Sequence, residues 1–205
     1  MTEVAHSTLT GAELHESKGV AAASANTVAV ANGSGSAPFT SLATFLATGT
    51  AATLAEITRV ADVSVRMVAA GATLSVTEAL HDGKTILLNS TGGSVCTLPA
   101  ASGSGMRLKF LVSVLATSAS HIVKVASSSD IIQGVVVTID TDTAGTSTGW
   151  ATASDSDTIT LNRTTTGSVM RGEWLELEDV ASNLWLVRGQ LANTASGATP
   201  FSATV

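Results

Sequence analysis

Alternation of apolar and polar residues dominates the chain from residue 72 onward, and it predicts a series of short β-strands. The clearest segment is 106–112, where one face carries Met106, Leu108, Phe110 and Val112 and the other carries Arg107 and Lys109. Comparable segments lie at 74–77, 85–88, 121–125, 135–139, 158–162, 173–177 and 184–188. Clusters of Gly, Ser, Asn and Asp separate them, and no helical periodicity intervenes. We therefore expect an all-β fold, either an antiparallel β-sandwich of jelly-roll-like type or a small barrel.

The first 40 residues follow a different pattern. Segment 9–16 has the length of one or two helical turns, and segment 19–38 consists mainly of Ala, Ser, Asn and Gly. So little apolar bulk cannot offset the entropy of ordering an independent unit, which predicts an extended arm that is ordered only against a partner. The sequence then divides into an arm at 1–40, a linker or short helix with a first strand at 41–71, the β domain at 72–191 and an extended tail at 192–205.

Length, charge and cysteine content narrow the classes of protein. A chain of 205 residues fits one domain with an arm. Its formal net charge is -6 and its 10 Lys and Arg residues are scattered, which argues against nucleic-acid binding. The longest apolar runs fall far short of a membrane span, and the first residues lack a signal-peptide pattern, so we expect synthesis in a cytoplasm without membrane insertion. The single cysteine, Cys96, cannot form an internal disulfide.

Three segments match part of a known phosphate- or metal-binding motif, but each lacks a residue that the motif requires. Residues 83–85 read Gly-Lys-Thr, but position 78 is Glu where a phosphate-binding loop needs Gly. Residues 15–16 read His-Glu, but position 19 is Gly where a zinc-protease helix needs its second His. Residues 140–145 resemble the start of a calcium loop, yet position 151 is Ala where that loop has a carboxylate. We interpret these segments as turns, and expect no catalytic residue, no metal site, no cofactor and no enzymatic activity.

The tryptophans point to an interface. Trp174 alternates with Glu176 and Glu178, which places it opposite the apolar face of its strand, whereas Trp185 lies opposite Leu184 and Leu186. Tryptophan is enriched at interaction hot spots, so Trp174 and Trp185 are predicted to contact another subunit. Packing on two faces of an ordinary core is the alternative interpretation.

Two N-terminal segments carry a resemblance. Segment 9–21, LTGAELHESKGVA, and segment 27–35, TVAVANGSG, resemble the N-terminal stretch of tailed-phage virion proteins of the head-fibre, decoration and tail-fibre-like type. Segments 74–110 and 157–177 are similar to the β domain of the same group. The resemblance implies a structural protein on the capsid surface of the virion, made in the host cytoplasm. It also implies a homotrimer that binds the major capsid protein through its arm while the β domain projects outward.

The resemblance focuses attention on five residues of the arm. We expect Leu9 and Leu14 to act as apolar anchors in capsid docking, and His15 and Glu16 to fix the register by hydrogen bonding. Lys18 completes the docking set. The alternative interpretation is an unstructured leader that only adds solubility.

Three functions therefore compete. The first is a capsid decoration (cement) protein or head fibre that stabilises the shell, with avidity from several arms. The second is a receptor- or glycan-binding fibre domain of a phage appendage. The third is a virion-attached depolymerase, which would need a pair of carboxylates in a cleft. The dense acidic group comprises Asp140, Asp142, Asp155 and Asp157.

Overall fold

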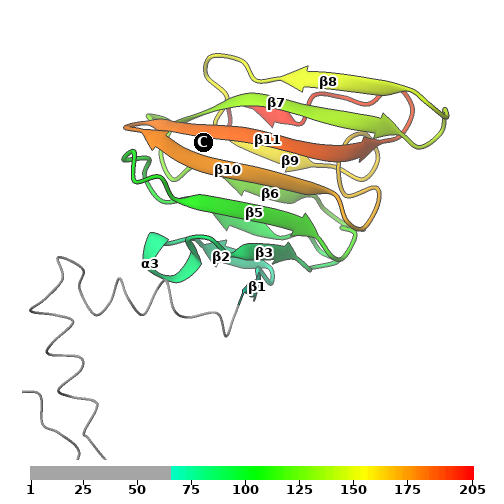
Figure 1. Ribbon diagram of the computed structural model, residues 1–205. Helices are drawn as coiled ribbons and strands as arrows, with labels where there is room; N and C mark the ends of the chain where they lie inside the picture. The colour runs from blue at the N-terminus through cyan, green and yellow to red at the C-terminus, as the bar shows by residue number, and fades with distance from the viewer. Residues whose placement is uncertain (1–65) are drawn as a thin grey trace, which may run out of the picture. The chain divides into compact units, whose positions relative to one another are not determined.

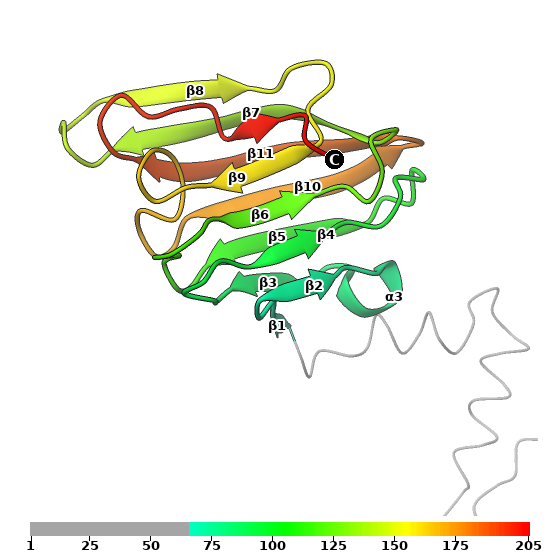
Figure 2. The same ribbon diagram turned by 180° about the vertical axis from the view of Figure 1, so that it is seen from behind.

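The computed structural model describes residues 66–205, which form two β-sheets stacked face to face (Figures 1 and 2). The first sheet has seven strands, in the spatial order β1 (Met67–Ala69), β3 (Thr85–Leu88), β5 (Arg107–Val112), β10 (Trp174–Ala181), β11 (Leu184–Asn193), β7 (Ile131–Asp140) and β8 (Ser147–Ala151). The second has five, in the order β12 (Phe201–Ser202), β9 (Thr158–Leu161), β6 (His121–Lys124), β4 (Val95–Thr97) and β2 (Thr73–Ser75). The predicted all-β, sandwich-type fold is confirmed.

Helix is confined, within residues 66–205, to the short α3 (Glu78–His81) between β2 and β3. Within these residues, no helix is long and apolar enough to span a membrane.

Strand pairing is mixed, which corrects the antiparallel expectation. The first six strands alternate between the two sheets, so β1, β3 and β5 run parallel in one layer and β2, β4 and β6 in the other. Each strand thus returns to its own sheet in the same direction after one passage through the opposite sheet. The antiparallel pairs all involve a strand after β6: β10 with β5 and β11, β8 with β7, and β9 with β6 and β12. Strand β11 pairs in parallel with β7.

The core lies between the sheets and follows the alternation of the sequence. In β10, the buried and half-buried residues alternate from Trp174 to Asp179, and β3 shows the same period. The largest fully buried side chains are Trp185 of β11 and Phe110 of β5, on the two sides of β10 in the seven-stranded sheet. The five-stranded sheet contributes Val123 and Ile159 from the opposite side.

The bounds of the β domain differ from those predicted. Strand 85–88 has the predicted bounds, but β7 and β11 extend well beyond the segments 135–139 and 184–188. Strands β8 and β12 were not expected. Residues 192–205 complete the domain: β11 continues to Asn193, and β12 pairs with β9.

Candidate functional site

The outer face of the seven-stranded sheet carries the most distinctive surface among residues 66–205. Strand β10 runs through its middle, with Leu175 and Leu177 buried beneath and Trp174, Glu176 and Glu178 on the outer side. No further layer of the described residues covers this face, as Figure 1 shows. The period of two in the sequence thus separates a core side from an outer side.

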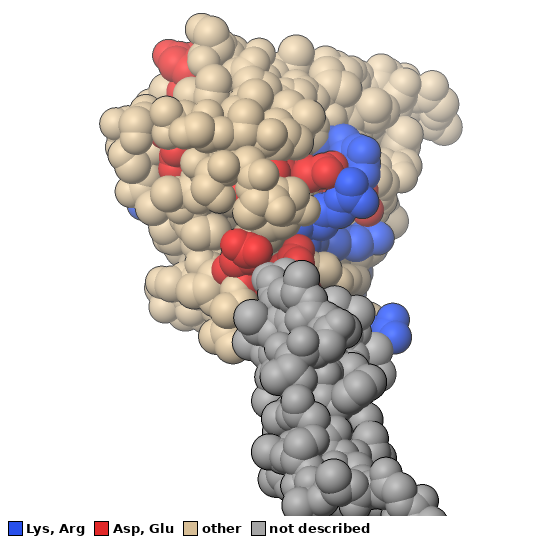
Figure 3. Space-filling model, turned by 60° about the vertical axis from the view of Figure 1, so that its left-hand side comes forward, with Lys and Arg blue, Asp and Glu red and all other residues tan. Residues whose placement is uncertain are grey.

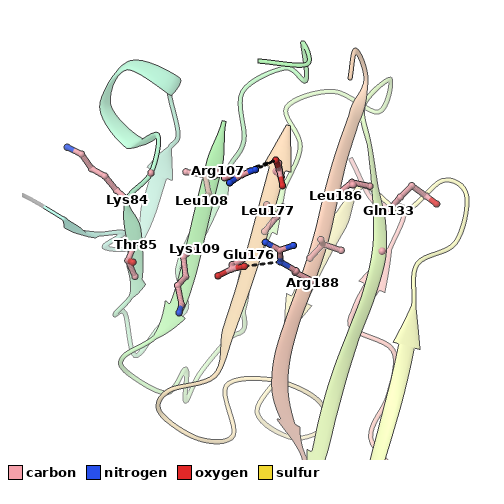
Figure 4. A pocket seen from close by; sticks show the side chains of 14 residues that line it. Lys84, Thr85, Arg107, Leu108, Lys109, Gln133, Glu176, Leu177, Leu186 and Arg188 are labelled. Carbon is pink, nitrogen blue, oxygen red and sulfur yellow. Dashed lines mark hydrogen bonds and ion pairs between the residues drawn. The ribbon is translucent and has the colours of Figure 1, made fainter. Parts of the chain in front are cut away.

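Charged side chains form cross-strand rows on this face. Register places Glu176 between Lys109 of β5 and Arg188 of β11, and the Arg188 Nε donates to the Glu176 Oε2 at 2.9 Å. In the next row, Arg107 lies opposite Glu178, and its Nη2 donates to the Glu178 Oε1 at 2.8 Å (Figure 4). This hydrogen bond raises the pKa of the Arg107 guanidinium above its ordinary value. Cross-strand pairs of opposite charge hold the two carboxylates in place.

A groove of about 540 Å³ follows these rows across the sheet. Its charged lining residues are Lys84, Arg107, Lys109, Arg188, Glu176 and Glu178. Four cations thus face two carboxylates, in a chain whose net charge is -6. The Lys and Arg side chains gather on one part of the surface beside acidic groups (Figure 3).

Two cations of the groove remain available to a ligand or partner. Lys84 and Lys109 have no ion pair with any residue that the structure describes. The Lys109 Nζ lies 5.1 Å from the centre of the Trp174 ring, within the range of a cation–π contact. An anionic partner could therefore bind these two unpaired ammonium groups without breaking the ion pairs Arg107–Glu178 and Arg188–Glu176.

An apolar stripe borders the groove on the β7 side. Val135, Val137 and Ile139 project from alternate positions of β7 and are 49, 43 and 42 % exposed, and Leu186 of β11 is 43 % exposed. Exposed β-branched residues in a row are uncommon on a surface that only faces water. Charge and apolar area thus lie side by side on one uncovered face, which is the composition of a binding surface.

The two tryptophans predicted at a subunit contact lie on opposite sides of the sheet. Trp174 is half-buried on the outer face, and its role in a subunit contact stays a prediction. Trp185 has no exposed surface and packs in the core. Its side chain cannot reach a second subunit, so the interface prediction for Trp185 is wrong. Leu184 and Leu186 occupy the outer side of β11 instead.

The five residues proposed for capsid docking, Leu9, Leu14, His15, Glu16 and Lys18, lie outside the described residues. Their role stays a prediction, as does the homotrimer. The first strand predicted within 41–71 corresponds to β1, and residues 41–65 lie outside the described residues.

Three residues of the dense acidic group, Asp140, Asp142 and Asp157, accept hydrogen bonds from backbone N–H groups. The Asp157 Oδ1 accepts hydrogen bonds from the Thr204 N–H at 2.8 Å and the Thr158 hydroxyl at 2.7 Å, and its Oδ2 accepts from the Val205 N–H at 3.1 Å. Burial works against ionisation of this carboxyl, but the hydrogen bonds outweigh it and lower the pKa of Asp157. Asp157 thereby fastens the end of the chain to β9.

Asp140 and Asp142 have comparable structural roles. The Asp140 Oδ1 accepts from the N–H groups of Asp142 and Thr143, which closes the turn between β7 and β8. The Asp142 Oδ2 accepts from the Ala195 N–H at 2.8 Å. The interpretation of this segment as a turn is confirmed. Over residues 66–205, no group of three or more His, Cys, Asp or Glu side chains is arranged to hold a metal ion.

Glu173 differs from Asp157 because only one of its carboxylate oxygens accepts hydrogen bonds. Its Oε1 accepts from the N–H groups of Val169 and Met170, while its Oε2 is buried without a hydrogen-bond partner. Burial raises the pKa of Glu173, and the hydrogen bonds only partly offset this. Its carboxylate fixes the loop before β10 and does not open into the groove.

The sequence did not predict the groove, although it did show which residues of two strands face outward. Alternation in 106–112 and in 173–177 identified the outer positions of β5 and β10. Their alignment with β3 and β11 required the register between strands that are distant in the chain.

Comparison of the chain with protein-family models, with curated proteins and with solved structures yields no match. Function must therefore be inferred from the chain's own residues and surfaces.

Proposed function

We propose that this protein is a structural component of a tailed-phage virion, a capsid decoration protein or head fibre that binds the outer shell and stabilises it. The observation that carries the proposal is the uncovered outer face of the seven-stranded sheet. There a groove with unpaired cations adjoins an apolar stripe on a rigid two-layer support. Such a face works by burying surface against another protein.

Two further observations support an assembly role. The N-terminal segments 9–21 and 27–35 resemble those of phage virion proteins. In addition, the buried carboxylates Asp157 and Asp179 accept hydrogen bonds from backbone N–H groups, so they serve the fold. The major capsid protein is the proposed partner, with the arm and the β domain contributing separate contacts whose affinities multiply.

The test is co-sedimentation of the full-length protein with empty shells of the phage that encodes it. We expect saturable binding to repeated sites. Leu14→Ala should lower shell occupancy while the melting temperature of the protein is unchanged. Unchanged occupancy would contradict a role of the arm in docking. Failure of the folded wild-type protein to bind shells would overturn the proposal.

A charge reversal tests the contribution of the groove. Lys109→Glu removes one of the unpaired cations and should weaken shell binding, because it places a third carboxylate beside Glu176 and Glu178. Lys124→Glu is the matched control, since it makes the same reversal on β6 of the other sheet. Equal effects of both variants would indicate general charge attraction and argue against the groove.

A receptor- or glycan-binding fibre domain is the second candidate, and the contact between Lys109 and Trp174 favours it. An ammonium group beside an aromatic ring provides both charge and a platform for an acidic sugar. Under this alternative, the protein would ignore shells and bind host polysaccharide, and Lys109→Glu would abolish that binding.

A further inference from the structure

Strand β8 leaves one side of its backbone unpaired at the end of the seven-stranded sheet. At the two ends of its ladder, the Thr152 N–H donates to the Gly134 carbonyl and the Asp140 N–H donates to the Thr146 carbonyl. Ladder bonds in an antiparallel pair recur at every second residue, so positions 148 and 150 also bond to β7. The backbone groups of positions 147, 149 and 151 therefore point away from the sheet.

None of these outward groups has a hydrogen-bond partner within residues 66–205. Ser147, Gly149 and Ala151 each present one free N–H and one free carbonyl along the edge. In Figure 1, β8 forms the border of the sheet, with no strand beyond it. This edge has the form that accepts another strand.

The edge also lacks the features that protect sheet edges from pairing. Proteins blunt their edges with charges, proline, bulges or very short strands. The other edge strands of the two sheets, β1, β2 and β12, have three, three and two residues. Strand β8 has five residues, Ser-Thr-Gly-Trp-Ala, with no charge and no proline, and its register with β7 is continuous.

We propose that β8 pairs antiparallel with β8 of a second copy of this chain, about a two-fold axis at Gly149. In this register Ser147 faces Ala151 of the second copy, Gly149 faces Gly149, and Ala151 faces Ser147. Each opposed pair exchanges two hydrogen bonds, which gives six in total and joins the two sheets into one. Every unpaired backbone group of the edge finds a partner.

The side chains are compatible with this close approach. On the outer face, the residues that meet are Ser147, Gly149 and Ala151, which are small and uncharged. On the other face, Thr148 lies opposite Trp150 of the second copy, an aromatic and β-branched pair of the kind that stabilises adjacent strands. No charge meets a like charge across the new edge.

A second copy fits this edge better than an unrelated strand because the free groups are symmetric about Gly149. An antiparallel arrangement aligns such a strand with itself without any shift. The pairing gives an even number of chains, whereas the resemblance to virion proteins implies a homotrimer. The mass of the full-length protein in solution therefore distinguishes the two.

The variant Gly149→Lys tests the pairing. A Cβ at position 149 meets no atom within 4 Å, so the single chain has room for the side chain. In the pair, two lysines would face each other on the axis, and we expect association to weaken by about tenfold or more. Gly149→Ala should keep the association. Ser128→Lys, which adds the same charge in the exposed loop between β6 and β7, should keep it too.

Light scattering over a range of concentrations gives the first result. We expect a mass of two chains for the wild-type protein and of one chain for Gly149→Lys at the same concentration. A single-chain mass for the wild type up to about 100 μM would overturn the proposal. A three-chain mass, or a variant that associates like the wild type, would overturn it as well.

Amide hydrogen exchange gives the second result and locates the contact. The amides of positions 147, 149 and 151 should become protected as the concentration rises, while those of 148 and 150, bonded to β7, stay protected throughout. Association without protection at the three outward positions would place the contact elsewhere. Protection that appears only when shells are added would assign the edge to a strand of the capsid protein and overturn pairing between copies.

Discussion

The Asp179 carboxylate on β10 accepts a hydrogen bond of 2.8 Å from the Gly103 N–H, which belongs to the loop between β4 and β5. The same carboxylate accepts from the N–H groups of Ser102 and Ser104 and from the Ser104 hydroxyl. One buried side chain thus holds three consecutive residues of a loop that crosses from one sheet to the other. Asp179 therefore stabilises the fold by fixing the loop between β4 and β5 to β10.

The variant Asp179→Asn is expected to destabilise the protein by about 2 to 4 kcal/mol, because an amide nitrogen would face N–H donors in place of a carboxylate oxygen. Urea unfolding measures the loss. Glu178→Gln is the control on the same strand, where the exposed pair with Arg107 is expected to contribute less than about 1 kcal/mol. Equal losses for the two variants would contradict the role given to Asp179.

The same residue makes stability depend on pH in the acidic range. Burial opposes ionisation of Asp179, but hydrogen bonds from Gly103, Ser102 and Ser104 outweigh it and lower the pKa. A carboxyl with a lowered pKa stabilises the fold above its unfolded value, near 3.8, and loses this contribution as the pH falls through the folded value. Asp179→Asn should therefore flatten the loss of stability below about pH 4.

His121 produces a pH dependence in a milder range. Its Nδ1 accepts from the Ser94 N–H at 3.0 Å, so the ring proton lies on Nε2, which donates to the Val114 carbonyl at 2.8 Å. Burial lowers the pKa of His121, and the bond to Val114 offsets this only in part. Below about pH 6.5 the unfolded chain binds a proton that the folded protein does not, so stability should fall by up to about 1.4 kcal/mol per pH unit.

Urea unfolding of the wild-type protein and of His121→Leu, compared from about pH 7.5 to about pH 5.5, measures this slope. The substitution should reduce the pH dependence whatever it does to the stability at neutral pH. A slope equal to that of the wild type would show that other groups cause the dependence.

Gly134 allows β7 and β11 to lie close together. Its φ is 147°, and a Cβ at this position would lie 2.0 Å from the Val187 carbonyl oxygen. Gly134→Ala should therefore cost about 2 to 4 kcal/mol, since one of the strands must move. Gly149→Ala in β8 is the matched control, because its Cβ meets no atom within 4 Å. Thermal unfolding of both variants should separate them clearly, and similar melting temperatures would contradict this account of Gly134.

Cys96 should be unreactive in the folded protein. The side chain is fully buried in β4, and burial raises the pKa of its thiol to about 12. Because the thiolate is the reactive form, a chromogenic disulfide reagent at about pH 8 should label the thiol only after denaturant is added. Rapid labelling of the native protein would show that β4 opens readily, and would contradict the protection of Cys96 by burial.

Much of the fold could be predicted from local pattern. Strand 85–88 followed from a short run of apolar residues bounded by turn signals, and the faces of β5 followed from alternation, because one side of the strand lies in the core. Strand β8 was missed because its outward residues are Ser, Gly and Ala, which leave no alternation of apolar and polar positions. Parallel pairing was missed because consecutive strands lie in different sheets, so hydrogen-bonded neighbours are remote in the sequence.

The candidate site shows the same limit. Alternation placed Trp174 opposite Leu175 correctly, since charged residues mark the outer side of β10. In β11 both faces are apolar, so the pattern could not determine whether Trp185 or Leu186 is buried. The groove depends on the register of five strands, β3, β5, β10, β11 and β7, which local spacing does not encode.

The central claim, that this chain is a structural component of a phage particle, is tested most directly by its presence in purified virions. Quantitative mass spectrometry of such particles gives the ratio of this chain to the major capsid protein. We expect a fixed ratio that survives repeated purification and corresponds to occupancy of repeated shell sites. Particles that are complete and infectious but lack the chain, while it accumulates free in the lysate, would contradict the account.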